Sequence, residues 1–390
     1  MDTLYLKPGR EKSVLNRHPW IFSGAIERIE GEPSAGSEVR ILDHQGSFLA
    51  RGYYSAAGDI RCRLLRWEDA PIDRPFLTGL IRQALALRQG FIGEDTDAYR
   101  IIHGEGDGLP GLIVDRYGDI LVMQISQAGF ERRLQLLIDI LVDELDPLAI
   151  YQRSEGAARQ AEGLPAATGV VYGDFNSGAV RISESGWIFY VDIIHGQKTG
   201  FYLDQRENRK FLSQLVRGKT VLNGYAYTGA FAVAALSGGA GRVINVDSSA
   251  AALELARKNI RENGFETAEA DFIAADMPTF LRQTDELYDV IILDPPPFAR
   301  HRKDVAAASR AYKDINLQAM KRLRRGGLLF TCSCSQHIAP DLLQKILFAA
   351  ARDAGRNVRI LAERGHPPDH PIHLFHPEGR YLHAFLLHVD

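Results

Sequence analysis

Residues 331–335 read TCSCS and hold two of the three cysteines of the chain, Cys332 and Cys334. A cysteine can ligate a metal, form a disulfide, pack as a small apolar group or act as a nucleophile. A disulfide between thiols one residue apart would be badly strained. No metal site is expected, because no third cysteine is near and the histidine-rich loop 364–380 lacks ligand spacing. Packing and nucleophilic chemistry remain, and the elements around the thiols have to decide between them.

The chain has 390 residues, of which 45% are hydrophobic and 24% charged, as in a soluble protein of two or three domains. No apolar run approaches the roughly 20 residues of a membrane span, and the N-terminus lacks a signal-peptide core. Three cysteines do not make a disulfide framework. We therefore expect a cytoplasmic protein with no membrane partner. The net charge of −3 neither indicates nor excludes nucleic-acid binding.

Three regions differ in their pattern of apolar residues. Residues 1–70 contain short β-like runs between Gly and Pro, which predicts a small β-rich domain. Residues 71–188 mix helical and strand patterns and predict a central α+β domain. Residues 189–390 alternate strands with helices and end in two strands expected to form an antiparallel hairpin. Five βα units and such a hairpin predict an α/β fold with a class I, Rossmann-like methyltransferase sheet.

The first region interleaves basic and aromatic residues in GREKSVLNRHPWIFSGAI and ARGYYS. Within residues 1–67, ten are Lys or Arg and eight are Asp or Glu. Cations hold phosphates and aromatic rings stack on bases, so this composition suits an RNA-binding surface. A solvated rim of a small barrel explains the same residues equally well.

In an open α/β sheet a ligand binds beyond the carboxyl ends of the strands. Four consecutive predicted strands are followed there by the loop NGYAYTG, Asp247, Asp276 and Asp294. The loop has no G-x-G-x-x-G pattern, so a pyrophosphate cradle is poorly supported. A carboxylate at Asp247 can accept both ribose hydroxyls of NAD or of S-adenosylmethionine, and Asp276 is placed to meet an adenine amino group. Each acid could instead cap the next helix, but four such strand ends together favour a methyl-donor site over NAD.

The segment DIIHGQKTGFYLDQRENRKFL leads into this last region. Asp204 and Glu207 have the spacing of a capping box for a helix QRENRKFLSQLVR, which a glycine follows. Phe201, Tyr202 and Arg206 lie beside the start of that helix. We expect them, with the backbone amides there, to face the amino-acid end of the cofactor.

The motifs together resemble a known family. HGQKTGFYLDQRENR, VLNGYAYTGAFAVAAL, VDSSAAALELARKNIRENG, LDPPPFAR, AYKDINLQAMKRLRRGGLLFTCSCS and HPEGRYL are similar to the large-subunit ribosomal RNA 5-methylcytosine methyltransferases of the RlmI type. GREKSVLNRHPWIFSGAI resembles the PUA RNA-binding domain with which that family begins, and GEGDGLPGLIVDRYGD resembles its middle domain. The similarity covers nearly the whole chain, and KTGFYLDQR is specific to this group and its close relatives.

The resemblance implies S-adenosylmethionine as the cofactor and large-subunit (23S) ribosomal RNA as the substrate. It implies that Asp247 binds the ribose, Asp276 the adenine and the NGYAYTG loop the methionine part. The full set of expected cofactor contacts is Phe201, Tyr202, Arg206, Asn223, Tyr227, Thr228, Gly229, Asp247, Ser248, Asp276 and Asp294.

Methyl transfer to cytosine C5 requires a nucleophile, because C5 accepts a methyl group only after a thiolate has added to C6. Cys332 and Cys334 are two apart and can face the same side of a strand, and Cys334 is nearer the strand's carboxyl end. The resemblance agrees, since the family motif Ser-Cys-Ser aligns with 333–335. We therefore expect Cys334 to be the nucleophile and Cys332 a packing residue. Asp294, expected on the neighbouring strand end, is the candidate to hydrogen-bond the cytosine N3 or N4 edge.

Other RNA 5-methylcytosine enzymes carry a second cysteine after a proline in the motif DPPPF, where this chain has Pro297. The RlmI-type family also lacks this cysteine, so its absence agrees with the resemblance. The proton acceptor that assists release of the thiolate has no candidate in the sequence. Phe298 is expected to stack on a flipped base, with core packing as the alternative. Residues 300–325 hold nine Lys and Arg against two Asp and Glu, which indicates a phosphate-rich substrate. The candidate RNA contacts are Phe298, Arg300, Arg302, Lys303 and Lys313.

Two other functions stay open at this point. A base-nitrogen methyltransferase would use the same fold and cofactor, because DPPPF resembles the loops of amino-group methyltransferases, which need no nucleophile. A non-catalytic RNA-binding protein would use the first domain and a degenerate pocket, although Asp247 and Asp276 are both present. The oligomeric state is not determined by the sequence, and a homodimer is one option.

Overall fold

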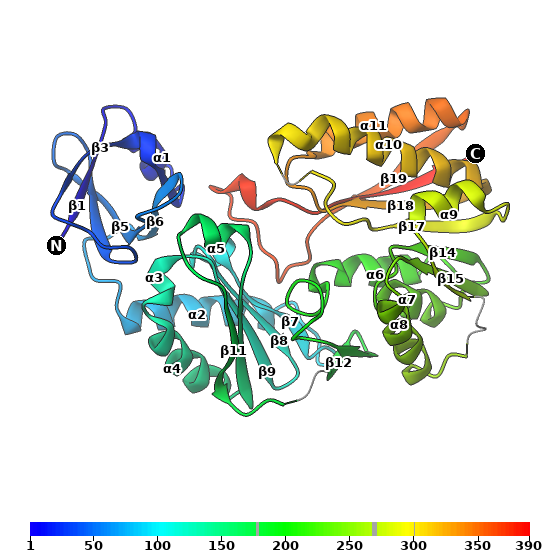
Figure 1. The fold of residues 1–390 in the computed structure, drawn as a ribbon, viewed down its shortest axis with the longest axis horizontal. Coiled ribbons are helices and arrows are strands. Elements are labelled where there is room, and N and C mark those ends of the chain that lie inside the picture. Colours follow the sequence, from blue (N-terminus) through cyan, green and yellow to red (C-terminus); the bar gives the residue numbers. More distant parts are fainter. Residues whose placement is uncertain (177–178, 267–270, 300) are drawn as a thin grey trace. The chain divides into compact units, whose positions relative to one another are not determined.

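The computed structural model describes residues 1–176, 179–266, 271–299 and 301–390. The chain forms two compact units (Figure 1). The first unit comprises Met1–Ile182, Val191–Leu203 and Pro368–Gly379, and the second comprises Ser183–Tyr190, Asp204–Pro367 and Arg380–Asp390. Each unit is therefore built from segments that are distant in sequence.

A six-stranded sheet at the N-terminus confirms the expected β-rich region. Its elements are β1 (Thr3–Leu6), α1 (Glu11–Leu15), β2 (Trp20–Phe22), η1 (Ser23–Ala25), β3 (Ile26–Glu30), β4 (Glu38–Leu42), β5 (Phe48–Tyr54) and β6 (Ile60–Arg66). The strands pair in the order β2-β6-β5-β4-β1-β3, and β1 runs parallel to β4. Apolar side chains that alternate along these strands, such as Leu4, Ile41 and Cys62, form its core.

The second sheet belongs to the same unit and has five strands in the order β11-β10-β9-β8-β7. Its elements are α2 (Arg74–Gln89), β7 (Ala98–His103), η2 (Gly104–Asp107), β8 (Leu112–Tyr117), β9 (Ile120–Ile125), α3 (Ala128–Glu131), α4 (Leu134–Leu145), β10 (Ala149–Ser154), α5 (Ala157–Ala161) and β11 (Ala167–Gly173). Asp73 caps α2 by accepting a hydrogen bond from the Phe76 amide at 3.1 Å. Tyr53 and Leu65 of the first sheet are buried in the core of the second. The expected boundary near residue 70 falls between β6 and α2 and stays a prediction.

A hairpin and a short helix follow, formed by β12 (Val180–Glu184), β13 (Trp187–Val191), η3 (Leu203–Gln205) and α6 (Arg206–Ser213). The expected capping box is wrong, because the N-cap of α6 is Gln205 and not Asp204. Asp204 lies in the preceding η3 turn, and its Oδ2 accepts a hydrogen bond from the Tyr381 hydroxyl at 2.8 Å. The helix also ends earlier than its sequence pattern predicts. The expected boundary at 188–189 lies within β13, and the domain limits stay a prediction.

The second unit contains the predicted methyltransferase sheet, of seven strands in the order β16-β15-β14-β17-β18-β20-β19. The strands are β14 (Thr220–Gly224), β15 (Arg242–Asp247), β16 (Phe272–Ala274), β17 (Tyr288–Leu293), β18 (Leu323–Ser333), β19 (Val358–Arg364) and β20 (His383–Val389). The first five are parallel, whereas β20 pairs antiparallel with both β18 and β19. The final hairpin is thus confirmed, with β20 inserted and β19 at the edge.

Helices cover both faces of this sheet. They are α7 (Ala230–Ser237), α8 (Ala250–Glu262), α9 (Met277–Gln283), α10 (Val305–Arg322) and α11 (Pro340–Ala354), with short turns at η5 (Arg302–Asp304) and η6 (Pro377–Gly379). Helices α6, α7 and α8 lie on one side of the sheet and α9, α10 and α11 on the other (Figure 1). No helix in the described part of the chain combines the length and apolar character needed to cross a membrane.

Candidate active site

Five parallel strands of the second unit end at one edge of its sheet. The strand register places Gly224 of β14 beside Val246 of β15 and Leu293 of β17, and Leu293 beside Thr331 of β18. The loops after these strands therefore start at the same level. The chain order reverses between β14 and β17, and such a switch point is where open α/β sheets bind ligands.

The loop after β14 has a strained backbone that Asp247 stabilises. Tyr225 and Tyr227 have φ angles of 58° and 46°, in the left-handed region that costs a residue with a side chain about 1–2 kcal/mol. Oδ2 of Asp247 accepts a hydrogen bond from the Tyr227 amide at 2.8 Å, and Oδ1 accepts one from the Ser249 amide at 2.8 Å. Strain of this kind is typical of ligand-binding loops, because the surrounding structure has to enforce it.

Asp247 and Asp276 differ in how they relate to the helices that follow them. Helix α8 is capped by Ser249, whose hydroxyl accepts from the Ala252 amide at 3.2 Å, so Asp247 is not the cap. A carboxylate oxygen can accept two hydrogen bonds, which leaves each oxygen of Asp247 able to accept a ribose hydroxyl. Asp276 is the N-cap of α9, with Oδ2 accepting from the amide and hydroxyl of Thr279 at 3.1 and 2.7 Å. The capping alternative thus describes Asp276, whose adenine contact stays a prediction.

Two hydroxyls beside the strained loop are buried. Within the described part of the chain, neither the Tyr225 hydroxyl nor Thr228 Oγ1 finds a hydrogen-bond partner. Burial, and then the charge of Asp276, raises the pKa of Tyr225 above its ordinary value, so the phenol stays protonated. A buried polar group without a partner costs about 1–3 kcal/mol, and polar atoms of a ligand can remove that cost. Tyr225 belongs to the predicted NGYAYTG loop but is not among the individual residues predicted to contact the cofactor, although its place directly after β14 was a usable signal.

Two further predicted contacts lie apart from this loop. Asn223 is buried within β14, and its side-chain amide donates to Oδ1 of Asn245 on β15 at 2.9 Å. Ser248 is exposed, next to the cap of α8. Asn223 therefore contributes to the interior of the sheet, and a cofactor contact of either residue stays a prediction.

The expected group at the start of α6 is divided between the units. Phe201 and Tyr202 belong to the first unit, where the Phe201 amide donates to the Tyr117 hydroxyl at 3.3 Å. Arg206 belongs to the second unit and is buried, with its Nε 3.6 Å from a Glu207 oxygen. Contact of these three residues with the cofactor stays a prediction.

The thiols differ in exposure. Cys62 and Cys332 are 0% exposed, whereas Cys334, one residue beyond β18, is half-buried. The Sγ atom of Cys334 lies 3.6 Å from the carbonyl oxygen of Pro295, in the loop after β17. Burial, together with the charge of Asp294, raises the pKa of the Cys332 thiol well above its ordinary value. Cys332 is therefore a buried, protonated thiol and Cys334 a partly exposed one, and the role of Cys334 as nucleophile stays a prediction.

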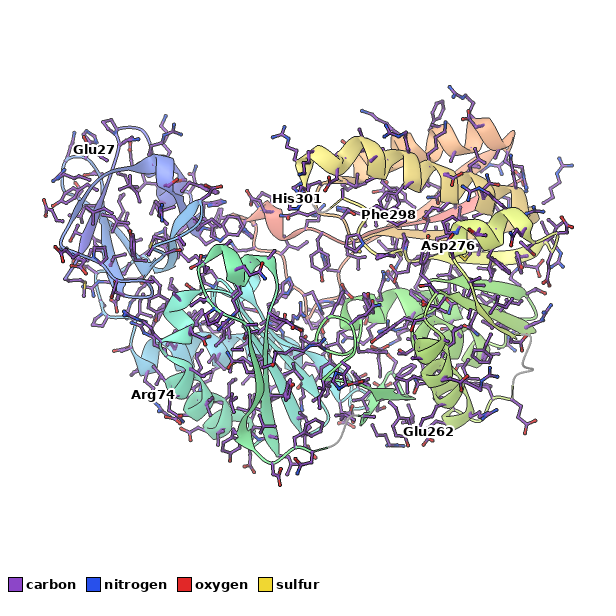
Figure 2. The ribbon with its side chains drawn as sticks, in the orientation of Figure 1. Glu27, Arg74, Glu262, Asp276, Phe298 and His301 are labelled. Atoms are coloured by element: carbon purple, nitrogen blue, oxygen red, sulfur yellow. The ribbon has the colours of Figure 1, made fainter. Side chains whose placement is uncertain are left out.

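Phe298 lies in the same loop after β17 and is half-buried. Figure 2 labels it in the second unit together with Asp276 at the start of α9. Its ring centroid is 4.6 Å from that of Tyr312 on α10, with 47° between the ring planes. One side of Phe298 is therefore used for packing, while its partial exposure leaves stacking on a base as a prediction.

Comparison with known proteins identifies the chain's relatives. A family model described as S-adenosylmethionine-dependent methyltransferase matches residues 156–375, and one described as PUA-like domain matches residues 4–67. Ribosomal RNA large subunit methyltransferase I of Escherichia coli O127:H6 (strain E2348/69 / EPEC) is 44% identical over 391 residues, which is 99% of both chains. The chain belongs to this family.

Solved structures agree with this assignment at the level of the fold. A chain from Streptococcus mutans described as a SAM-dependent methyltransferase has a TM-score of 0.85 at 22% identity, with 100% of both chains covered. SMU.776, described as a methyltransferase complexed with SAH, has a TM-score of 0.86 at 22% identity and the same coverage. As a member of this methyltransferase family, the chain uses S-adenosylmethionine as its cofactor. The donor set fits it, since Asp247 suits the ribose and two buried hydroxyls of the loop after β14 have no hydrogen-bond partner among the described residues.

The basic stretch of this family member is partly neutralised by acids outside it. Lys313 pairs with Asp353 of α11 at 2.5 Å, and Arg324 pairs with Asp289 at 2.9 Å. Lys313 would have to leave its partner, or share it, to hold a phosphate. The two cations of η5 that were predicted as RNA contacts, Arg302 and Lys303, are exposed. The predicted contact Arg300 lies outside the described residues.

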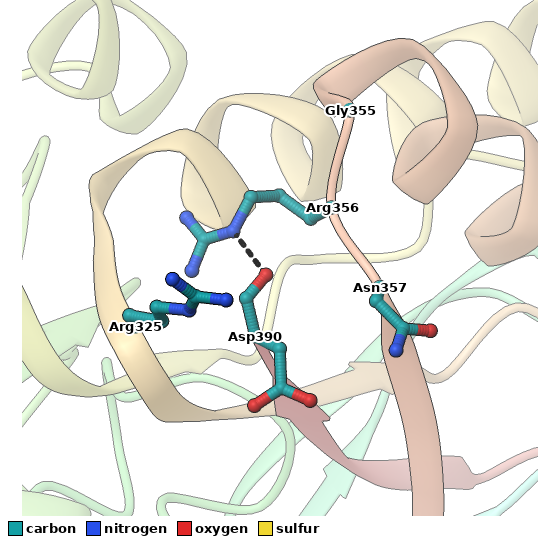
Figure 3. A pocket seen from close by; sticks show the side chains of 5 residues that line it. All are labelled: Arg325, Gly355, Arg356, Asn357 and Asp390. Atoms are coloured by element: carbon teal, nitrogen blue, oxygen red, sulfur yellow. Dashed lines mark hydrogen bonds between the residues drawn. The ribbon is translucent and has the colours of Figure 1, made fainter.

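A cavity of about 640 Å³ lies at the opposite edge of the sheet, where β18 and β19 begin and β20 ends (Figure 3). Arg356 in its wall donates through Nε to the Asp390 backbone oxygen at 2.8 Å and through Nη1 to the Met320 carbonyl at 2.7 Å. These bonds join the ends of α10 and β20. The cavity therefore lies at the edge of the sheet opposite to the strand ends that carry Asp247 and Leu293. Among the described residues, no three His, Cys, Asp or Glu side chains are grouped as metal ligands.

Proposed function

We propose that this chain transfers a methyl group from S-adenosylmethionine to C5 of a cytosine in 23S large-subunit ribosomal RNA, through a covalent bond between Cys334 and C6 of the base. The observation that carries the proposal is the half-buried Cys334 thiol at the carboxyl edge of the sheet, while the other two thiols are fully buried. The ribosomal RNA in the name of the E. coli relative supports the choice of substrate. The cytoplasm, where ribosomes are made, is the compartment we propose.

The chemistry of the proposed reaction begins at Cys334. Its Sγ forms a bond to C6 of the cytosine, which raises the electron density at C5. S-adenosylmethionine would supply an electrophilic methyl group there. As C5 forms a bond to the methyl carbon, the bond between that carbon and the sulfonium sulfur would break, with S-adenosylhomocysteine as the leaving group. A base then removes the C5 proton, the electron pair restores the C5–C6 double bond, and the Sγ–C6 bond breaks. The thiolate is the reactive form, so the surroundings of Cys334 have to favour its deprotonation.

Asp294 is the residue proposed to activate the cytosine ring for attack by the thiolate. It follows β17 directly, and its charge acts on the Cys332 thiol, so its carboxylate lies near the end of β18. A carboxylate there can accept a hydrogen bond from cytosine N4 or from a protonated N3, and protonation of the ring makes C6 a better acceptor for the thiolate. In the same proposal Phe298 stacks on the flipped base, and Arg302 and Lys303 hold the flanking phosphates.

The test compares Cys334→Ala with Cys332→Ala, a matched loss of one thiol from the same strand end. The substrate is large-subunit ribosomal RNA from a strain in which the gene is deleted. The incorporation of labelled methyl groups is measured, and mass mapping of the product RNA then locates the modified nucleotide. We expect Cys334→Ala to lose at least about 1,000-fold in kcat, as loss of a nucleophile does, while Cys332→Ala retains activity. Full activity of Cys334→Ala would exclude the covalent mechanism and favour methylation of a base nitrogen.

The variant Asp294→Asn tests the second proposed role with the same substrate. We expect it to lose transfer while its affinity for S-adenosylmethionine, measured by calorimetric titration, stays unchanged. An unaffected transfer rate would remove Asp294 from the mechanism. Lack of cofactor binding by the native chain would contradict the whole proposal. A homodimer stays a prediction, which sedimentation velocity of the native chain tests directly.

A further inference from the structure

The hydroxyl of Tyr312 lies at the centre of a buried hydrogen-bond network around the proposed nucleophile. Tyr312 is on α10 and is 0% exposed. The Ser333 hydroxyl donates to the Tyr312 oxygen at 3.1 Å, and Ser335 Oγ lies 3.1 Å from the same oxygen. Ser333 and Ser335 are the two neighbours of Cys334 in the chain. The phenol therefore holds the turn that carries the thiol on both sides.

The same phenol also holds the loop after β17. The Phe298 ring contacts the Tyr312 ring, with 4.6 Å between the two ring centroids. Ser335 Oγ accepts a further hydrogen bond from the Ala299 amide at 3.3 Å. The turn after β18 and the loop after β17 are thus joined through one side chain that comes from neither strand.

The hydrogen-bonding capacity of the group is matched by its neighbours. A phenol oxygen accepts two hydrogen bonds and donates one. The Ser333 hydroxyl donates to it, and Ser335 Oγ, which accepts from the Ala299 amide, can also accept the phenol proton. Burial raises the pKa of Tyr312 above its ordinary value, so the proton stays on the oxygen at neutral pH. The network is neutral, hydrogen-bonded on both sides of Cys334 and shielded from water, which makes it rigid.

We propose that Tyr312 is a positioning residue, which fixes the Cys334 thiol in register with the loop that carries Asp294 and Phe298. This rests on the proposed function, since the register matters only if the thiol attacks a base held by that loop. Displacement of a reacting group by about 1 Å can cost 10²-fold in rate, so a tie between the two loops has a direct catalytic consequence. The simple alternative is that Tyr312 is a core aromatic whose hydroxyl contributes only stability.

Tyr312→Phe separates the positioning role from a purely structural one, because it keeps the ring that packs on Phe298 and removes only the hydroxyl. The matched control is Tyr288→Phe, another buried tyrosine, whose hydroxyl lies 3.4 Å from the Thr284 hydroxyl and contacts neither loop. We expect Tyr312→Phe to lower kcat for ribosomal RNA methylation about 10- to 100-fold, with the KM of cofactor and RNA within twofold of the native values. Ser335→Ala, which removes a different bond of the same network, should lower kcat in the same direction. The control Tyr288→Phe should leave kcat unchanged.

A second measurement is independent of catalysis. Iodoacetamide should label only Cys334 in the folded chain, because Cys62 and Cys332 are buried. We expect the pH profile of that labelling to shift in Tyr312→Phe and to stay unchanged in Tyr288→Phe. A kcat within twofold of native in Tyr312→Phe, or an equal loss in both tyrosine variants, would overturn the positioning role. Failure of the covalent mechanism itself is seen separately, as activity in Cys334→Ala.

Discussion

Replacement of Gly229 by alanine is expected to destabilise the second unit and to weaken cofactor binding. Gly229 is the N-cap of α7 and has a φ of 77°. A Cβ atom at this position would lie 2.8 Å from Cβ and 3.1 Å from Cα of Ala256, on α8. Real Cβ atoms do not approach another atom so closely, so α7 and α8 have to move apart. The loop between β14 and α7 has to move with them.

The size of the effect follows from these two causes. The left-handed backbone costs an alanine about 1–2 kcal/mol, and insertion of a methyl group into a packed interface costs about 1–3 kcal/mol. We therefore expect Gly229→Ala to reduce the free energy of unfolding by about 2–5 kcal/mol. Gly264 is the matched control, since it has a φ of 78° but no atom within 4 Å of an added Cβ. Gly264→Ala should show the backbone cost alone, about 1–2 kcal/mol.

The assays are urea unfolding and calorimetric titration with S-adenosylmethionine, on both variants and the native chain. Asp247 and the strained loop form one hydrogen-bonded arrangement, and a shift of the loop by tenths of an ångström should raise the Kd about tenfold or more, equivalent to about 1.4 kcal/mol. Gly264→Ala should bind the cofactor as the native chain does. A Gly229→Ala variant no less stable than Gly264→Ala would refute the clash between α7 and α8. A native Kd in Gly229→Ala would refute the assignment of this loop to the cofactor.

Two further predictions concern buried charges of the second unit. Arg209 forms a two-pronged ion pair with Glu184 at 2.7 and 2.6 Å, and both side chains are almost completely buried. Arg209→Met should lower the free energy of unfolding by about 3–5 kcal/mol, because it leaves Glu184 buried without its partner. Adding Glu184→Leu to the same chain should restore most of the lost free energy, as measured by urea unfolding of the single and the double variant. Burial, with a contribution from Arg380, lowers the pKa of His383 from 6.5 to about 4. Between these pH values the unfolded chain thus binds a proton that the folded chain does not, so the free energy of unfolding should decrease as the pH falls from about 6.5 towards 4. This part of the pH dependence should be absent in His383→Gln. A plot of the urea midpoint against pH with the same slope in His383→Gln as in the native chain would contradict the prediction.

The sequence by itself determined the alternating strands and helices of the methyltransferase sheet and its final antiparallel hairpin, and it predicted at which edge of that sheet the functional groups lie. Strand and helix periodicities predicted the succession of strands and helices along the chain. The rule that ligands bind at the carboxyl ends of parallel strands then selected Asp247, Asp294 and Cys334 as candidate site residues. It also distinguished Cys332 of β18 from Cys334 just beyond that strand, because the thiol farther along the chain was expected to be less covered, and it is the more exposed of the two. The inference about the fold succeeds because it depends on neighbours a few residues apart, whereas the roles of Asp247, Asp294 and Cys334 stay predictions.

Only the tertiary structure decided which distant groups meet. Gln205 rather than Asp204 occupies the N-cap position of α6, and Asp204 instead accepts a hydrogen bond from the hydroxyl of Tyr381, near the far end of the chain. The pairing of Lys313 with α11 reduces a charge excess that the sequence alone presents as available. Tyr312 shows the same limit, since its helical position predicts an ordinary buried aromatic. Its hydroxyl acquires a role only where α10 crosses the ends of β17 and β18, and a local pattern records which face of a helix is buried but not what it is buried against.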